Sequence, residues 1–350
     1  MIQPKSICLL GCLFLFGSLM GQKAHFFNDS AHVFVQSGAT IYVQGDVSND
    51  DSGTFDHSGN LHFSGDWTNT AGNAAFINSS PGTVYFFGTN QYIQGTDLTR
   101  FPSVTLSGTG IKTQRGVDSE IEDIFDLVDS EWATNSQVLS VTNPNREAIL
   151  RNIGFVSSDS LNGFLVRAMN STDDYLFPVG SNGMVHNAPY RYRPVMLRPE
   201  NSTVNSFGVR MANLDASNDF TGGGIGFSRD NRPPTIGGIN EYFYHNINHF
   251  SGTSRADINI YYYNVDGDFK SIARWQNENY WRDINATVST VSNVPNTDGA
   301  NRVATYLEWD NFAPDGFALD FPCSVDTAGG IMGDEVACDS YDPTPITSVS

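Results

Sequence analysis

The chain has 350 residues, with 19 Lys and Arg against 38 Asp and Glu, so its formal net charge is -19 and its isoelectric point lies near 4.5. Phosphate backbones would repel so acidic a chain, which argues against nucleic acid and anionic membrane surfaces as partners. Divalent cations and basic molecules are the partners that this charge favours.

Residues 1–21 have the pattern of a secretory signal peptide. Lys5 is followed by an apolar run that ends at Met20, and polar sequence begins after Gly21. We therefore expect cleavage after Gly21 and a secreted or cell-surface location. The alternative is a lipoprotein signal at Cys12, although it would leave an apolar core of only a few residues. No later apolar run is long enough for a transmembrane helix, so we expect none in the mature chain.

Residues 22–151 repeat a short phrase of alternating apolar residues between glycine turns. Three copies read QSGATIYVQGDVSND, HSGNLHFSGDWTNT and SSPGTVYFFGTNQYIQGT, and FPSVTLSGTGIKT is a looser fourth. Alternation within units of about 20 residues predicts short strands and tight turns. One such unit cannot bury its own apolar face, so we expect successive units to stack in a β-helix-like solenoid. The expected inner column comprises Val33, Val35, Ile41, Val43, Leu61, Phe63, Val84 and Phe86.

Residues 117–132 (VDSEIEDIFDLVDSEW) also fit helical spacing, with acidic residues at the positions between the apolar ones. The sequence that follows continues the series of short strands and turns, so we predict strands here too. We interpret the acidic run from Asp118 to Glu131 as a solvated face. The alternative is a pair of carboxylates of the kind that polysaccharide-degrading β-helix enzymes use.

Beyond Asn152 the alternating segments become longer, as in YRYRPVMLRP, NSFGVRMANL, DINIYYYNV and FKSIARW. Longer alternating strands with Asx and Gly turns predict an antiparallel β-sandwich over residues 152–322. The fold class that we expect is therefore all-β, a solenoid followed by a sandwich. Residues 220–238 form a long loop rich in Gly and Pro, and its glycines lack the strand-turn-helix context of a phosphate loop. Residues 323–350 have the composition of a linker.

The recurring pairs Gly45-Asp46 and Gly65-Asp66 are candidate calcium ligands, because stacked turns could align their carboxylates. We favour a structural interpretation, in which glycine supplies a positive φ and the aspartate accepts hydrogen bonds from turn amides.

A second candidate calcium site is the segment NVDGDF, in which Asn264, Asp266 and Asp268 alternate. It lacks the distal Glu and other ligands of a calcium loop. An Asp-Gly hairpin without metal is the interpretation that we favour.

His245 and His249 have a zinc-ligand spacing only if they lie on a helix, and the sequence around them alternates like a strand, so we expect structural histidines. Aromatic side chains on a sheet can stack on sugars, and the candidates are Tyr242, Tyr244, Trp275 and Trp281. Alternate members of such a set must fill the core of a sandwich. Cys323 and Cys338 remain after removal of the signal peptide. In an oxidising compartment they pair with each other or with cysteines outside this chain.

The segments NGFLVRAM, YLFPVGS, YRYRPV, SIARWQNENYWRDI and FAPDGFALD occur in an order that resembles large surface proteins of Bacteroidota. Such proteins are cargo of the type IX (gliding-linked) secretion system. The tail AGGIMGDEVACDSYDPTPITS is similar to the start of the immunoglobulin-like repeats that follow in them. This cargo normally ends in a sorting domain, which is not found in these residues.

The expected function is that of a non-enzymatic, structural or adhesive exported protein that presents or spaces a binding surface. The alternative is a carbohydrate-binding module or polysaccharide-degrading enzyme that uses the solenoid carboxylates or the aromatic sheet face. No cofactor is expected, except Ca²⁺ at the acidic turns if they bind metal.

Overall fold

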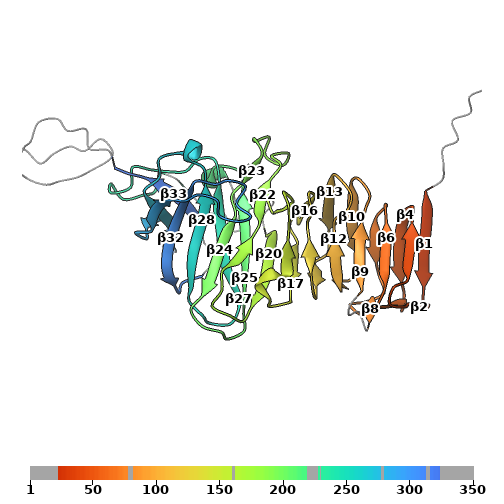
Figure 1. The fold of residues 1–350 in the computed structure, drawn as a ribbon. Coiled ribbons are helices and arrows are strands. Elements are labelled where there is room, and N and C mark those ends of the chain that lie inside the picture. The colour runs from red at the N-terminus through yellow and green to blue at the C-terminus, as the bar shows by residue number, and fades with distance from the viewer. Residues whose placement is uncertain are drawn as a thin grey trace, which may run out of the picture.

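The computed structural model describes residues 23–77, 82–159, 162–218, 228, 230–276, 280–312 and 316–323. It confirms the predicted fold class. A β-solenoid of about 7 turns covers residues 24–180, and antiparallel sheets that fit a sandwich follow it (Figure 1). The predicted signal peptide and Cys338 lie outside the described residues, as does nearly all of the predicted linker.

Each turn of the solenoid contributes three strands, one to each of three parallel faces. The first three turns are β1 (Ala24–Asp29), β2 (His32–Val35) and β3 (Thr40–Val43); β4 (Gly45–Asp50), β5 (Thr54–His57) and β6 (Asn60–Phe63); and β7 (Trp67–Asn69), β8 (Phe76–Ile77) and β9 (Thr83–Phe86). The next two are β10 (Gln91–Gly95), β11 (Thr99–Phe101) and β12 (Ser103–Thr105); and β13 (Ile111–Arg115), β14 (Ser119–Ile121) and β15 (Phe125–Asp126). The last two are β16 (Glu131–Ala133), β17 (Val138–Val141) and β18 (Ile149–Leu150); and β19 (Phe155–Ser157), β20 (Phe164–Met169) and β21 (Tyr175–Phe177).

The alternating pattern of the sequence fixes which side chains enter the solenoid. Ile41, Leu61 and Val84 are register partners on successive turns and point inward, because side chains alternate across a strand. Most of the predicted inner column is buried, and its first-turn members Val33 and Ile41 are partly buried. Strands β14, β15 and β16 occupy residues 117–132, so the strand prediction there is confirmed.

The parallel stacking continues past Asn152, where we placed the domain boundary, as far as β22 (Val179–Ser181). Each face then receives an antiparallel strand. β23 (Arg191–Tyr192) pairs with β22, β24 (Val195–Pro199) with β21, and β25 (Asn205–Ala212) with β20. The sandwich therefore closes the C-terminal end of the solenoid, and one hydrophobic core runs through both parts.

The sandwich consists of the extended sheets that begin at β20 and β21. The first continues through β25, β27 (Tyr244–Ser251), β33 (Gly316–Phe321), β29 (Ser271–Gln276) and β30 (Tyr280–Asp283), with β26 (Gly238–Ile239) beside β33. The second continues through β24, β28 (Ala256–Tyr262), β32 (Arg302–Trp309) and β31 (Thr287–Thr290). The described helices are the short 3-10 turns η1 (Arg146–Ala148), η2 (Ala216–Asn218) and η3 (Asn264–Asp266), and none is long and apolar enough to cross a membrane.

The predicted Asp-Gly hairpin at residues 264–268 is wrong. β28 before it belongs to one sheet and β29 after it to the other, so this segment crosses between the sheets. Both strands find antiparallel neighbours elsewhere, since β28 pairs with β24 and β32, and β29 with β33 and β30.

Leu165 tests whether the two parts share one core. It is fully buried on β20 and is the register partner of Leu139 in the solenoid and Val209 in the sandwich. We expect Leu165→Ala to lower the free energy of unfolding by about 2–5 kcal/mol, because it leaves a cavity. Hydrogen exchange should accelerate in the last solenoid turns and in the sandwich together.

Leu150→Ala is the matched control, because Leu150 is 42% exposed. Its effect on the free energy of unfolding should stay within about 0.5 kcal/mol. Acceleration of exchange in only one of the two parts would contradict the shared core.

Candidate functional site

The turn aspartates connect successive turns of the solenoid. The Asp46 carboxylate accepts a hydrogen bond from the backbone N–H of Asp66, and the Asp66 carboxylate accepts one from that of Tyr92, both at 2.8 Å. The predicted role of these carboxylates as acceptors of turn amides is therefore confirmed, and each one reaches the following turn of the solenoid.

The reason for the glycines differs from the one that we predicted. Gly45 and Gly65 are not among the residues with positive φ. A Cβ at Gly45 would overlap the carbonyl oxygen of Ala24, and one at Gly65 would overlap the Asp46 carboxylate. The glycines are required because neighbouring turns approach so closely.

The second calcium candidate is also occupied by structural contacts. The Asp266 carboxylate accepts a hydrogen bond from Nε of Arg193 at 2.7 Å, and both side chains are 8% exposed. It also accepts the backbone N–H of Tyr263 at 2.9 Å, and the Asn264 side chain bonds Asn301. Asp268 is exposed. Within the described ranges, no three His, Cys, Asp or Glu side chains are grouped so that they could hold a metal ion.

Because these carboxylates already have partners, we expect Ca²⁺ to leave the stability unchanged. Thermal melts recorded with millimolar Ca²⁺ and with a chelator should coincide, with Mg²⁺ as the control for ionic strength. A rise in melting temperature with Ca²⁺ alone would show that the acidic turns bind this metal.

His245 and His249 make structural contacts. The His245 ring is buried, and its Nε2 lies 2.9 Å from the backbone oxygen of Arg193. Burial lowers the pKa of His245 to about 4, so it is neutral at pH 7. The His249 ring stacks on Phe207, with ring centroids 4.2 Å apart.

Three of the four candidate sugar-stacking residues fill the core instead. Tyr244, Trp275 and Trp281 are buried together in a second hydrophobic cluster, so their faces are not available to a ligand. Tyr242 is 47% exposed, with the Arg191 guanidinium 5.3 Å from its ring centre. Alternation along the strands places these rings on one face of the sheet. The sequence did not show that this face is the covered one.

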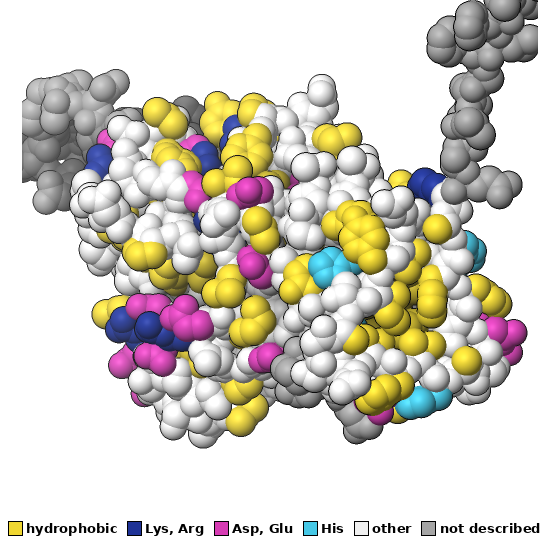
Figure 2. Space-filling model, turned by 45° about the vertical axis from the view of Figure 1, so that its right-hand side comes forward, with side chains coloured by type: hydrophobic (Ala, Val, Ile, Leu, Met, Phe, Trp, Pro, Cys, Tyr) yellow, Lys and Arg dark blue, Asp and Glu magenta, His cyan; other side chains and the backbone are white. Residues whose placement is uncertain are grey.

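Other aromatic side chains lie on the outer surface of the solenoid. The rings of His62 and Tyr85 stack at 4.0 Å, and Tyr42 stacks on Phe87 at 4.6 Å. Figure 2 shows hydrophobic and histidine side chains over this part of the molecule, in the right half of the view.

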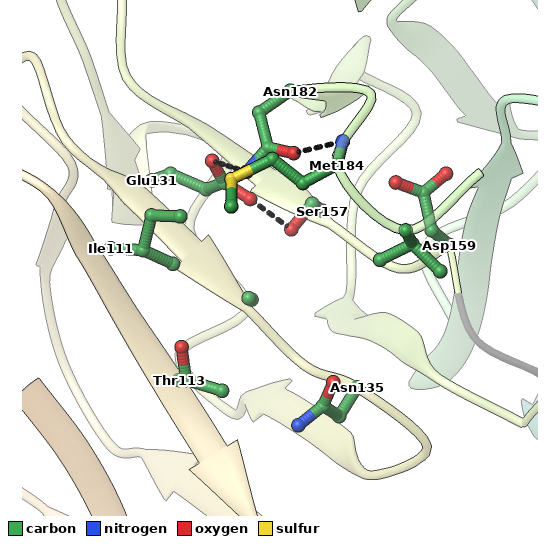
Figure 3. A pocket seen from close by; sticks show the side chains of 10 residues that line it. Ile111, Thr113, Glu131, Asn135, Ser157, Asp159, Asn182 and Met184 are labelled. Carbon is green, nitrogen blue, oxygen red and sulfur yellow. Dashed lines mark hydrogen bonds between the residues drawn. The ribbon is translucent and has the colours of Figure 1, made fainter. Parts of the chain in front are cut away.

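A cavity of about 150 Å³ lies where the solenoid meets the sandwich (Figure 3). The segment 182–190, which connects β22 to β23, covers one side of it, and strands β13, β16 and β19 form the other. Its lining residues are Ile111, Thr113, Glu131, Ala133, Asn135, Ser157, Asp159, Asn182, Met184 and Val185.

Strand alternation explains why polar side chains face this cavity. Trp132 on β16 and Val156 on β19 point into the solenoid core, so their neighbours point outward. Those neighbours include Glu131 and Ser157, which the covering segment removes from solvent.

Glu131 is the central polar group of the cavity and is 8% exposed. One carboxylate oxygen accepts a hydrogen bond from the Ser157 hydroxyl at 2.5 Å, and the other accepts one from the Asn182 amide at 2.7 Å. Burial raises the pKa of Glu131, the two hydrogen bonds act against this rise, and the charge of Asp159 adds to it.

Asp159 lies on the other side of Ser157 in Figure 3 and is 4% exposed. Its carboxylate accepts hydrogen bonds from the Ser181 hydroxyl and from the backbone N–H of Asn213 at 3.1 Å. Burial raises the pKa of Asp159, while these two bonds and the nearby charges of His186 and Arg210 lower it. The cavity thus contains two carboxyl groups whose pKa values are both raised, a common property of binding and catalytic sites.

The sequence indicated only part of this site. Glu131 ends the acidic run that we interpreted as a solvated face, and for Glu131 that interpretation is wrong. Asp159 and the segment 182–190 were not singled out, because nothing local shows that a connection about 50 residues after Glu131 covers it. The sequence signal that could have indicated the site was the position of Glu131 next to Trp132, whose side chain points into the solenoid core.

Comparisons with family models, curated proteins and solved structures found no match to this chain.

A further buried carboxyl group, Asp320 on β33, lies outside this cavity. Its register partners are Ile239 and Ser271, and it is fully buried. Burial and the charge of Asp283 raise the pKa of Asp320 to about 8, while Lys270 acts in the opposite direction.

We expect Asp320→Asn to stabilise the protein at neutral and alkaline pH. In the unfolded chain the carboxyl ionises near pH 4, whereas the folded protein keeps the proton up to about pH 8. The contribution of Asp320 to stability is therefore complete below pH 4 and is lost as the pH rises to 8. The advantage of the variant should grow over this range to a few kcal/mol at most.

Urea denaturation at pH 4, 6 and 8 measures this effect, with the exposed Asp310→Asn as the control. A stability difference that does not change with pH would contradict the raised pKa of Asp320.

Proposed function

We propose that this chain is a non-enzymatic exported protein of the cell surface or extracellular space, with a structural and adhesive role. The observation that carries this proposal is the construction of the molecule as a stack of turns closed by a sandwich. Such a stack holds its outer faces at fixed spacing, because inner side chains and turn carboxylates make the contacts between turns. Residues on the outer faces then remain available for binding.

The sequence supports the export part of the proposal. The leader pattern of residues 1–21 and the resemblance to Bacteroidota surface proteins both favour secretion, and the same resemblance favours the type IX route. Immunoglobulin-like repeats after Cys323 belong to this proposal as well. Cys323 is disulfide-bonded, which fits an oxidising compartment.

A carbohydrate-active protein is the second candidate, because Glu131 and Asp159 form the kind of buried carboxyl pair that sugar hydrolysis uses. The size of the cavity weighs against it. Pockets for larger ligands measure about 300–1,000 Å³, whereas this cavity measures about 150 Å³.

Two assays on the secreted full chain separate these candidates. We expect beads coated with the protein to adhere to immobilised glycoproteins or polysaccharides, and we expect no reducing sugar from the same polysaccharides. Adhesion should exceed that of beads coated with another protein of similar negative charge.

Release of reducing sugar that Glu131→Gln or Asp159→Asn abolishes would replace this proposal with an enzyme. Absence of adhesion to every surface tested would remove the adhesive role.

A further inference from the structure

The Glu131 cavity has a chemical character that selects among ligands. Glu131 is a buried carboxylate whose hydrogen-bond donors, Ser157 and Asn182, are both neutral. Among the described residues, no Lys, Arg or His side chain forms an ion pair with it. A buried carboxylate is costly without a counter-charge, so a cation that enters the cavity would gain a strong partner.

The walls of the cavity restrict which cation can enter. Ile111, Ala133, Met184 and Val185 give the lining an apolar part, and Met184 and Val185 are 75% and 56% exposed. These two exposed side chains belong to the covering segment, so they mark the entrance. Glu131 and Asp159 are the two carboxylates of the lining, and the described residues contain no group of three His, Cys, Asp or Glu side chains that could hold an ion such as Ca²⁺.

The size of the cavity points to a short chain of atoms. At about 150 Å³, the cavity is smaller than the roughly 300–1,000 Å³ of pockets for drug-sized ligands, so a slender group fits it better than a bulky one. An unbranched alkyl stem of four carbons that ends in an ammonium group has five heavy atoms. Its stem would lie against the apolar walls, and its charged end would reach the carboxylate.

We propose that the Glu131 cavity binds a primary ammonium group on an unbranched alkyl stem, presented by a lysine side chain of a protein partner. The proposal rests on the proposed binding function, for which it names the partner chemistry. The formal charge of -19 attracts lysine-rich partners over longer distances. Glu131 is the group that contacts the ammonium.

Methyl NMR of the full chain with labelled methionines tests the site directly. Met184 lines the cavity, whereas Met169 is fully buried in the core and serves as an internal reference. We expect Nα-acetyl-lysine N-methylamide to shift the Met184 methyl signal saturably and to leave Met169 unchanged. The norleucine analogue, which has a similar stem without the ammonium, should bind at least tenfold more weakly.

Two variants show whether the charge and the space are both needed. Glu131→Gln removes the charge and should weaken binding at least tenfold, whereas Glu147→Gln removes an exposed carboxylate elsewhere and should leave it unchanged. Ala133→Leu keeps Glu131 and fills the cavity, so it should also abolish binding. An unchanged Met169 signal shows that each variant is folded.

Several outcomes would overturn the proposal. Equal binding to wild type and Glu131→Gln, or no shift at Met184, removes the site. If Nα-acetyl-arginine N-methylamide binds more tightly than the lysine derivative, the ligand group is a guanidinium and not an ammonium. If pentylamine binds and the lysine derivative does not, the site binds alkylammonium groups, but a lysine side chain of a protein partner is excluded as the ligand.

The bead assay keeps this inference separate from the proposed function. Loss of lysine binding in Glu131→Gln with unchanged adhesion would exclude the cavity as the adhesive site. Lysine binding by a protein that does not adhere would remove the adhesive role and leave the cavity in place.

Discussion

The edge of a parallel β-stack leaves backbone N–H and C=O groups unpaired, and this constraint governs the structure. At the C-terminal end of the solenoid each of the three faces receives an antiparallel strand, and β23, β24 and β25 satisfy these groups. One sandwich sheet thus continues a solenoid sheet from β20 into β25, and the other begins at β21 in the last turn of the solenoid. The connection from β22 to β23 must turn back at this edge, and it passes over Glu131 as it does so. The cavity is a consequence of how the stack ends.

Between its ends, the stack is stabilised by polar contacts as well as by the apolar column. Asn28, Asn49 and Asn69 occupy equivalent positions of successive turns and are buried. The Asn28 amide donates to the Asn49 side-chain oxygen at 2.8 Å, and Asn49 donates to that of Asn69 at 3.4 Å. Farther along, the buried Lys112 ammonium donates to the carbonyl oxygens of Gly88, Thr89 and Thr109. Each of these side chains thereby donates hydrogen bonds to its own or an adjacent turn.

The sequence predicted features that repeat and missed features that depend on distant contacts. The solenoid was predictable because alternation places Leu61 and Val84 inward at a regular spacing, and the Gly-Asp pairs mark its turns. The prediction of a hairpin at Asp266 was wrong because the residues of a turn do not determine which sheets β28 and β29 join. The sequence left the aromatic platform open as an alternative for a related reason. Tyr244, Trp275 and Trp281 have a strand pattern that is compatible with either face being covered, and only the tertiary structure determines which one is.

The contacts that hold the fold together do not explain why the cavity contains a carboxylate at Glu131. The turn aspartates pair with amides of the next turn, and Asp266 pairs with Arg193, so these carboxylates serve the fold. Glu131 is also buried, but its donors are neutral and its neighbouring charge, Asp159, is of the same sign. A neutral polar side chain would satisfy Ser157 and Asn182 without the cost of a buried charge. The carboxylate at this position therefore gains its full stabilisation only when a cation enters from outside, at the entrance marked by Met184 and Val185.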